Sequence, residues 1–190
     1  MPAKLYCYVD ETGQHTQGEL FIVCVVLAGS ERDDLLSACE AIESRTGKRG
    51  KWIKTAYELR AAYIREVLNQ PLFHGRLTFS VFRQTTDYTR ATILAVSKAI
   101  KVSGETDYKA TILIDGLTRS QERTMARSLR QQGIRLRKLR GARDEGNALI
   151  RLTDSICGLV AAAMGGQPIM KILYDRALES GFLRDISGEE

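Results

Sequence analysis

The segment Leu5–Gly13, LYCYVDETG, places two carboxylates at the end of an apolar stretch. Its first five residues are apolar or aromatic, which is typical of a buried β-strand, and Gly13 favours a turn directly afterwards. A buried strand seldom ends in Asp10 and Glu11 without partners for them, because burial of an unpaired charge is strongly unfavourable. The segment therefore predicts a core strand whose end places carboxylates in a site, and the rest of the sequence indicates what kind of site this is.

The length and composition are those of a globular protein. The 190 residues fit the size of one domain, and we expect a single domain over residues 1–190. Apolar residues make up 44% and charged residues 27% of the chain, which argues against a disordered protein. Lysines and arginines total 28 against 23 acidic residues, a net charge of +5 that mildly favours polyanionic partners.

The sequence also predicts where the protein resides. Its N-terminus, MPAKLYCYVD, has no secretory-signal pattern. The apolar run Leu20–Ala28 is far shorter than the ~20 residues that span a bilayer as a helix. We therefore expect a cytoplasmic protein that does not enter the membrane. The four cysteines lie singly in apolar segments and are expected to be reduced core residues, in preference to disulfides or zinc ligands: Cys7, Cys24, Cys39 and Cys157.

Hydrophobic periodicity and capping residues predict about five strands and several helices. The expected strands are Lys4–Val9, Glu19–Ala28, Arg76–Arg83, Lys109–Asp115 and Arg135–Leu139. The expected helices are Ser30–Ser44, Tyr57–Leu68, Asp87–Val102, Thr118–Gln132, Glu145–Met164 and Ile169–Ser180. Two strands that form a hairpin, followed by alternating strands and helices, favour an α/β fold with a mixed sheet flanked by helices on both faces.

Three aspartates need a physical explanation. Asp10 and Asp115 each end an apolar strand before a glycine turn, and they would face each other if the two strands were neighbours. Asp154 lies opposite the core stripe of its helix, yet its own side carries mainly apolar or small residues. A helix that is apolar all round is buried, so this carboxylate needs a cation. The alternatives are ordinary turn-capping aspartates and an ion pair between Asp154 and Arg151.

A cluster of carboxylates without histidine or thiolate is the ligand set that suits Mg²⁺ or Mn²⁺. Close carboxylates repel one another unless cations neutralise them. Two metal ions ~4 Å apart can activate water and stabilise the leaving oxygen of a phosphodiester. The three aspartates therefore suggest a metal-dependent phosphodiesterase.

The chain resembles the RNase H-like superfamily, and more closely the family catalogued as domain of unknown function 3800. Asp10–Gly13 is similar to the family's D-E-S-G motif, with threonine in place of serine, and Lys51-Trp52 matches its Lys-Trp segment. Arg151–Asp154, followed by SICGLVAAA, is similar to its Q-x-x-D helix. Arg151 replaces the glutamine of that motif and puts a cation one helical turn from Asp154.

The resemblance implies an RNase H-like fold and a divalent-metal nuclease site. Asp10, Asp115 and Asp154 would be the metal ligands, with Glu11 as a further catalytic candidate. Adjacent strand residues point to opposite faces, so Glu11 would need a bend in the chain to reach the same metal. Asp144 and Glu145 are expected to cap the helix that carries Asp154, and a contribution to the site is the alternative.

Basic segments are candidate nucleic-acid-binding sites. Four arginines line one face of the helix Thr118–Gln132, and further cations follow it, among them Arg143. A second basic segment, KRGKWIK, contains the only tryptophan, which could stack on an unpaired base or anchor the core. A solvated helix face is the alternative for the arginines. The candidate residues are Lys51, Trp52, Lys54, Arg119, Arg123, Arg127, Arg130 and Arg143.

The leading hypothesis is thus an enzyme, a Mg²⁺- or Mn²⁺-dependent nuclease acting on DNA or RNA. The alternative is a binding module that holds nucleic acid or protein on the same scaffold without catalysis. A nucleotide phosphotransferase is less favoured, because the chain has no Gly-rich phosphate loop. The sequence leaves the choice of DNA or RNA, internal or terminal cleavage, and a monomer or homo-oligomer open.

Overall fold

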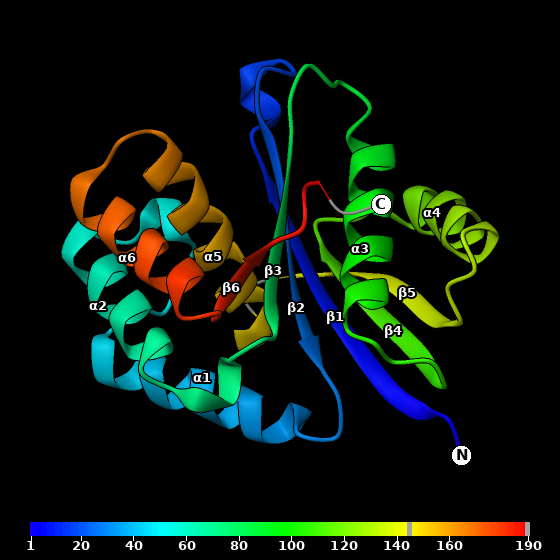
Figure 1. Ribbon diagram of the computed structural model, residues 1–190, viewed down its shortest axis with the longest axis horizontal. Helices are drawn as coiled ribbons and strands as arrows, with labels where there is room; N and C mark the ends of the chain where they lie inside the picture. Colours follow the sequence, from blue (N-terminus) through cyan, green and yellow to red (C-terminus); the bar gives the residue numbers. More distant parts are fainter. Residues whose placement is uncertain (144–145, 189–190) are drawn as a thin grey trace.

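The computed structural model describes residues 1–143 and 146–188, which contain a mixed sheet of six strands in the order β5-β4-β1-β2-β3-β6 (Figure 1). β1 pairs antiparallel with β2, and β2 with β3, while the other neighbours are parallel. The strands are β1 (Ala3–Thr12), β2 (Phe21–Ala28), β3 (Leu77–Phe82), β4 (Tyr108–Asp115), β5 (Leu136–Ala142) and β6 (Leu183–Asp185).

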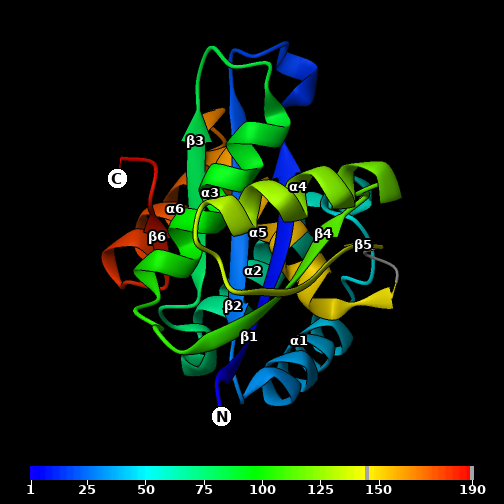
Figure 2. The same ribbon diagram turned by 90° about the vertical axis from the view of Figure 1, so that its right-hand side faces the viewer.

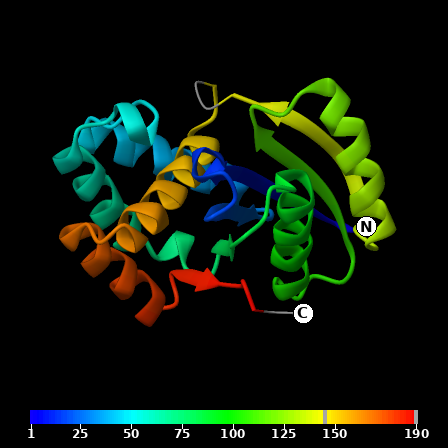
Figure 3. The ribbon, with the colours of Figure 1, turned by 90° about the horizontal axis from the view of Figure 1, so that it is seen from above.

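Helices cover both faces of this sheet (Figures 1 and 3). One face, called the α5 face below, packs against α1 (Arg32–Thr46), α2 (Tyr57–Leu68), α5 (Ala148–Met164) and α6 (Pro168–Glu179). The other, the α4 face, packs against α3 (Tyr88–Val102) and α4 (Arg119–Gln131), which lie in front of the sheet in Figure 2. Because side chains alternate along each strand, each face has its own apolar cluster, and the expected mixed sheet between two helical layers is confirmed.

Besides shifts of up to three residues at the ends of elements, the predicted and observed elements differ in one strand and two helix caps. The sixth strand, β6, was not predicted; it has only three residues and pairs with β3. The expected cap at Ser30 is wrong, because α1 begins after Glu31, whose carboxylate accepts a hydrogen bond from the Gly29 N–H. α5 begins at Ala148 and is capped by the Asn147 side chain. The expected caps Asp144 and Glu145 lie outside the described residues.

Two further expectations concern helices and cysteines. All four cysteines are buried and unpaired, as predicted. Within residues 1–143 and 146–188, no single helix is long and apolar enough to cross a membrane; α5 and α6 reach the required length and apolarity only together, and the chain bends by 114° between them.

Candidate active site

Asp10 and Asp115 lie side by side because β1 and β4 are parallel neighbours. The register pairs Val9 with Ile114, so each aspartate is one residue beyond that pair. Val9 and Ile114 belong to the apolar cluster of the α4 face, and alternation along the strands directs the two aspartates to the α5 face. The sheet therefore brings these two carboxylates together, as expected for neighbouring strands.

α5 contributes the third aspartate. Its predicted core stripe is buried, and this packing holds the helix across β1 and β2. Asp154 is on the side of α5 that borders a cavity of about 490 Å³, which Asp10 and Asp115 also line. Its Oδ2 accepts a hydrogen bond of 2.6 Å from the backbone N–H of Trp52. Carboxylates from two strands and one helix thus border the same cavity.

The electrostatics of this cavity disfavour a charged Asp10. Its side chain is only 8% exposed, and burial raises the pKa of Asp10 to about 8, with repulsion from Asp154 as the next cause and from Asp115 as a smaller one. The Glu11 N–H donates to Asp10 Oδ1 at 2.8 Å, which partly opposes this shift. Positive charge close to Asp10 would therefore favour its ionised form.

Glu11 borders the cavity, but its carboxylate is held by other residues. Oε2 accepts a hydrogen bond of 2.5 Å from the Thr92 hydroxyl of α3, and Oε1 one of 3.1 Å from Gln14. Burial raises the pKa of Glu11 against the effect of these two hydrogen bonds. Because Thr92 belongs to the α4 side of the sheet, Glu11 would have to leave it to act with Asp10, and its catalytic role stays a prediction.

The loop between α1 and α2 supplies a cation at this cavity. Lys51 Nζ lies 3.3 Å from Asp115 Oδ2 in an ion pair. The next residues form the short 3₁₀ helix η2 (Trp52–Lys54), whose first N–H binds Asp154. Lys54 is exposed at its end. The predicted basic loop therefore lies directly over the carboxylates.

Trp52 is a buried core anchor, the alternative that the sequence left open, and its nucleic-acid-binding role stays a prediction. The side chain is 8% exposed. One face of the ring packs on Gly158 of α5, and the Arg60 guanidinium lies 5.2 Å from the ring centroid. The packing of Trp52 explains the glycine within SICGLV of α5, whose partner the sequence alone does not identify.

Replacement of Gly158 by alanine is expected to destabilise the protein by about 1–3 kcal/mol, since the added methyl would overlap the Trp52 ring. A glycine-to-alanine change inside a helix otherwise stabilises by roughly 1 kcal/mol. The sign of the change in unfolding free energy therefore shows whether the Trp52 ring packs on Gly158. Urea unfolding measures the stability, and the fluorescence of the only tryptophan should shift to the red. Gly188→Ala, at an open position, is the control. A stabilised Gly158→Ala variant with unchanged fluorescence would contradict this packing.

Arg151, the residue that departs from the resembled motif, is bound to Glu43 of α1. Its Nε and Nη2 each lie 2.7 Å from a Glu43 carboxylate oxygen, and the two side chains are 13% and 7% exposed. This hydrogen bonding raises the pKa of Arg151. The pairing with Glu43 explains a buried arginine on α5 without assigning it to Asp154, which was the alternative derived from the sequence.

The donor set of the cavity fits Mg²⁺ or Mn²⁺ in chemical type, because all its anionic groups are carboxylates. Among the described residues, however, no three potential ligands stand in a metal-binding arrangement. Asp115 is engaged with Lys51 and Asp154 with the Trp52 N–H. These two contacts account for carboxylates that share a cavity without converging on one point.

The arginine stripe of α4 lies on the opposite side of the sheet from the three aspartates (Figure 2). Met125 and Leu129 are buried against the sheet, and the predicted cap from Thr118 and Gln121 is present. The four arginines are exposed: Arg119, Arg123, Arg127 and Arg130. Arg143, also exposed, follows the end of β5. The sequence predicted the helix and its stripe, but not the face of the sheet on which they lie.

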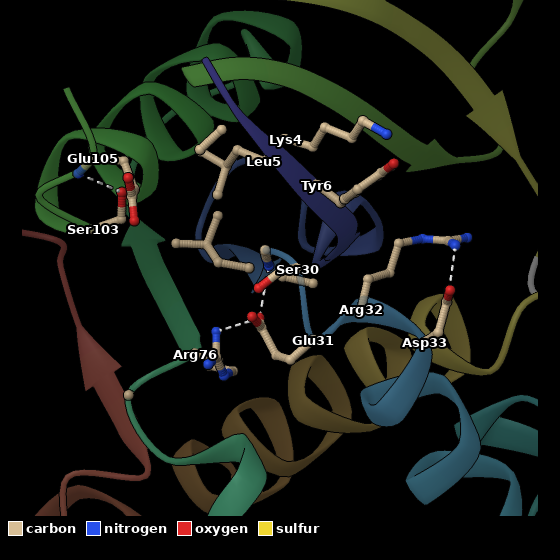
Figure 4. A pocket seen from close by; sticks show the side chains of 15 residues that line it. Lys4, Leu5, Tyr6, Ser30, Glu31, Arg32, Asp33, Arg76, Ser103 and Glu105 are labelled. Atoms are coloured by element: carbon tan, nitrogen blue, oxygen red, sulfur yellow. Dashed lines mark hydrogen bonds and ion pairs between the residues drawn. The ribbon is translucent and has the colours of Figure 1, made fainter. Parts of the chain in front are cut away.

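A second hollow, of about 720 Å³, lies at the other end of β1 (Figure 4). Its charged side chains are bound mainly to one another: Arg76 lies 2.6 Å from Glu31, and Arg32 binds Asp33 and the Tyr8 hydroxyl. This internal pairing leaves no convergent set of groups for a reaction, and the carboxylate cavity is the candidate active site.

Comparisons with solved structures agree with this fold. The chain is similar to RNase HII from Archaeoglobus fulgidus in its complex with PCNA, with 13% identity, a TM-score of 0.50, and coverage of 95% of this chain and 91% of the other. It is also similar to ribonuclease H2 from Pyrococcus horikoshii, with 10% identity, a TM-score of 0.52, and coverage of 95% and 81%. The fold is RNase H-like.

No family model and no curated protein matches the sequence. Membership of the family of domain of unknown function 3800 therefore stays a prediction.

Proposed function

We propose that this protein is a nuclease that hydrolyses nucleic-acid phosphodiesters with Mg²⁺ or Mn²⁺ held by Asp10, Asp115 and Asp154. The observation that carries the proposal is that three carboxylates from β1, β4 and α5 border one cavity, where burial, and then repulsion from Asp154 and Asp115, raises the pKa of Asp10. A site that keeps such unfavourable charges together is expected to use them. The RNase H-like fold is compatible with this chemistry but does not specify it.

Each residue of the cavity has a role in this proposal. A bound divalent ion would supply an activated water and stabilise charge on the leaving oxygen. Asp10, Asp115 and Asp154 would hold it, and the Trp52 N–H orients Asp154 through its 2.6 Å hydrogen bond. Lys51, paired with Asp115 in the structure, would be placed to bind a phosphate oxygen if a metal ion occupied that carboxylate.

The proposed partner is DNA or RNA, which suits the net charge of +5. A reducing compartment such as the cytoplasm suits four buried, unpaired cysteines. The partner is proposed from the net charge and the compartment from the cysteines, so neither proposal depends on a bound metal.

Metal binding and cleavage are expected together. Mn²⁺ at about 100 times its dissociation constant should stabilise the folded protein by about 2.7 kcal/mol, which thermal unfolding would register as a raised Tm. The same preparation should cleave labelled single-stranded or double-stranded DNA or RNA, and EDTA should abolish both effects. Absence of metal-dependent cleavage on all four substrates would contradict the proposal.

A non-catalytic binding module is the second candidate, because the Lys51–Asp115 ion pair already places a cation at the carboxylates. This function predicts an unchanged Tm with Mn²⁺ and salt-sensitive binding of nucleic acid that EDTA leaves unaffected. The two assays above therefore separate the two candidates.

A further inference from the structure

Part of the α5 face is not covered by a helix. α5 packs across β1 and β2 but touches β4 only slightly, and β4 and β5 extend beyond it in Figure 3. On the α4 face, Ile112 and Ile114 of β4 are fully buried, whereas Leu113 and Thr111, which point to the α5 face, are only half-buried. A surface of the sheet is thus left open beside the candidate active site.

The strand register shows what this surface carries. Thr111 of β4 pairs with Lys138 of β5, Leu113 pairs with Arg140, and Asp115 pairs with Ala142. The register is irregular between Ala110 and Thr111 of β4. This irregularity allows Leu136 and Leu139 to face the core under α4 while Lys138 and Arg140 face the α5 side. We call Thr111, Leu113, Asp115, Lys138 and Arg140 the open strip.

The cations of the open strip lead toward the carboxylates. Lys138 and Arg140 are two residues apart, roughly 7 Å along the strand, and Asp115 belongs to the next row, one strand across at about 5 Å. Both cations are exposed, and among the described residues neither side chain forms a hydrogen bond or an ion pair. They are therefore available to an anionic ligand that also reaches Asp115.

We propose that the phosphodiester backbone of the scissile nucleic-acid strand lies along the open strip, with its phosphates bound by Arg140 and Lys138. This inference rests on the proposed nuclease function and specifies where its substrate lies. A negatively charged backbone complements two successive cations, and the half-buried sheet surface between them has no helix to exclude it. The strand then enters the cavity at Asp115, where a phosphate would meet Lys51.

This path differs from the one suggested by the arginine stripe. Arg123 and Arg127 border a groove of about 790 Å³ between α4 and β5, on the far side of the sheet from Asp10. Lys138, on the edge strand, also borders this groove, whereas Arg140 is not among its lining residues. A strand held there would have to pass around the β5 edge before reaching the carboxylates. The open strip reaches them on the same face, so its cations are expected to govern productive binding.

Two matched double variants test this inference. Lys138→Gln with Arg140→Gln removes two exposed cations from the open strip, and Arg123→Gln with Arg127→Gln removes two exposed cations from α4. Fluorescence anisotropy with labelled DNA and RNA, single-stranded and duplex, in EDTA measures binding without cleavage. Loss of two phosphate contacts should weaken single-strand binding roughly 20-fold at about 0.1 M salt and reduce the slope of log K against log salt by about 1.4. The α4 variant should change little.

The outcomes separate this inference from the proposed function. If the Lys138/Arg140 variant binds like the wild type, or if both variants weaken equally through net charge, the inference is overturned even when the wild type cleaves with Mn²⁺. If its binding falls as expected but the wild type never cleaves, the strip is supported as a binding surface and the nuclease function fails. Cleavage by the Lys138/Arg140 variant should show a raised KM at little changed kcat; a lowered kcat at unchanged KM would count against the inference.

Discussion

Replacing Asp10 with asparagine is expected to lower Mn²⁺-dependent cleavage by about 10³-fold, because loss of a metal ligand removes several kcal/mol of transition-state stabilisation. Asparagine keeps the size of the side chain and the hydrogen bond that Asp10 Oδ1 accepts from the Glu11 N–H. Initial rates at saturating Mn²⁺ measure the loss. Asp34→Asn, which changes an exposed aspartate of α1, should cleave like the wild type.

The same Asp10→Asn variant is expected to be more stable than the wild type at high pH without metal. The pKa of Asp10 is raised to about 8 in the folded protein from an ordinary 3.8, so the folded state binds the proton more tightly than the unfolded state. The wild type therefore loses stability as the pH rises through the window between these values. The asparagine side chain cannot ionise, and the variant should gain at least ~2 kcal/mol near pH 9.

The cleavage rate and the stability of the Asp10→Asn variant together distinguish loss of a metal ligand from damage to the fold. Urea unfolding in EDTA at pH 5 and pH 9 gives the stability difference between wild type and variant at each pH. A variant that is inactive and also less stable at pH 9 would point to damage of the fold, and it would contradict the electrostatic account of the site. Retained cleavage would exclude Asp10 from the metal ligands.

Replacing Arg151 with methionine is expected to lower the free energy of unfolding by about 3–5 kcal/mol, because Glu43 would be left as a buried charge without its partner. The exposed pair Arg45–Glu66 provides a matched control: its side chains are 51% and 41% exposed, so Arg45→Met should cost at most about 1 kcal/mol. Denaturant unfolding at constant pH measures both variants.

A double variant, Arg151→Met with Glu43→Met, should recover much of the loss, since it removes both charges of the buried pair. Equal and small effects of Arg151→Met and Arg45→Met would contradict the assignment of Arg151 to Glu43. Where the folded Arg151→Met protein can be prepared, its cleavage rate should remain within a few-fold of the wild type. A rate loss like that of Asp10→Asn would return Arg151 to the active site.

The sequence predicted the carboxylates well because their signal is local. Asp10 and Asp115 each follow the apolar run of a strand and precede a glycine turn, and the parallel pairing of β1 with β4 was the only further condition for their meeting. Asp154 was recognisable as an acid on a helix that is apolar almost all round. Each of these patterns depends only on residues close in sequence, within one strand or within a few turns of one helix.

The remaining features depend on contacts between distant segments. In the sequence, Glu43 is one of several charged residues of a helix, and only the fold pairs it with Arg151. The packing of the Trp52 ring on Gly158 likewise joins two segments that are far apart in the sequence. The position of α4 follows from the side on which the chain crosses from β4 to β5, which no local pattern specifies. β6 is three residues long, too short for an alternation of polar and apolar residues to identify it.

The pairing of β1 with β4 also sets when the carboxylates can meet during folding. Ala3 is opposite Tyr108, so more than half of the chain must close into a loop before the two strands align, at a considerable entropic cost. Contacts of such sequence separation are slow to form. The repulsion that Asp115 and Asp154 exert on Asp10 therefore arises only as β4 and α5 dock. While only β1 and β2 have been synthesised, Asp10 is present without Asp115 and Asp154. Pairing of these two strands is therefore not opposed by the charges of the other two aspartates.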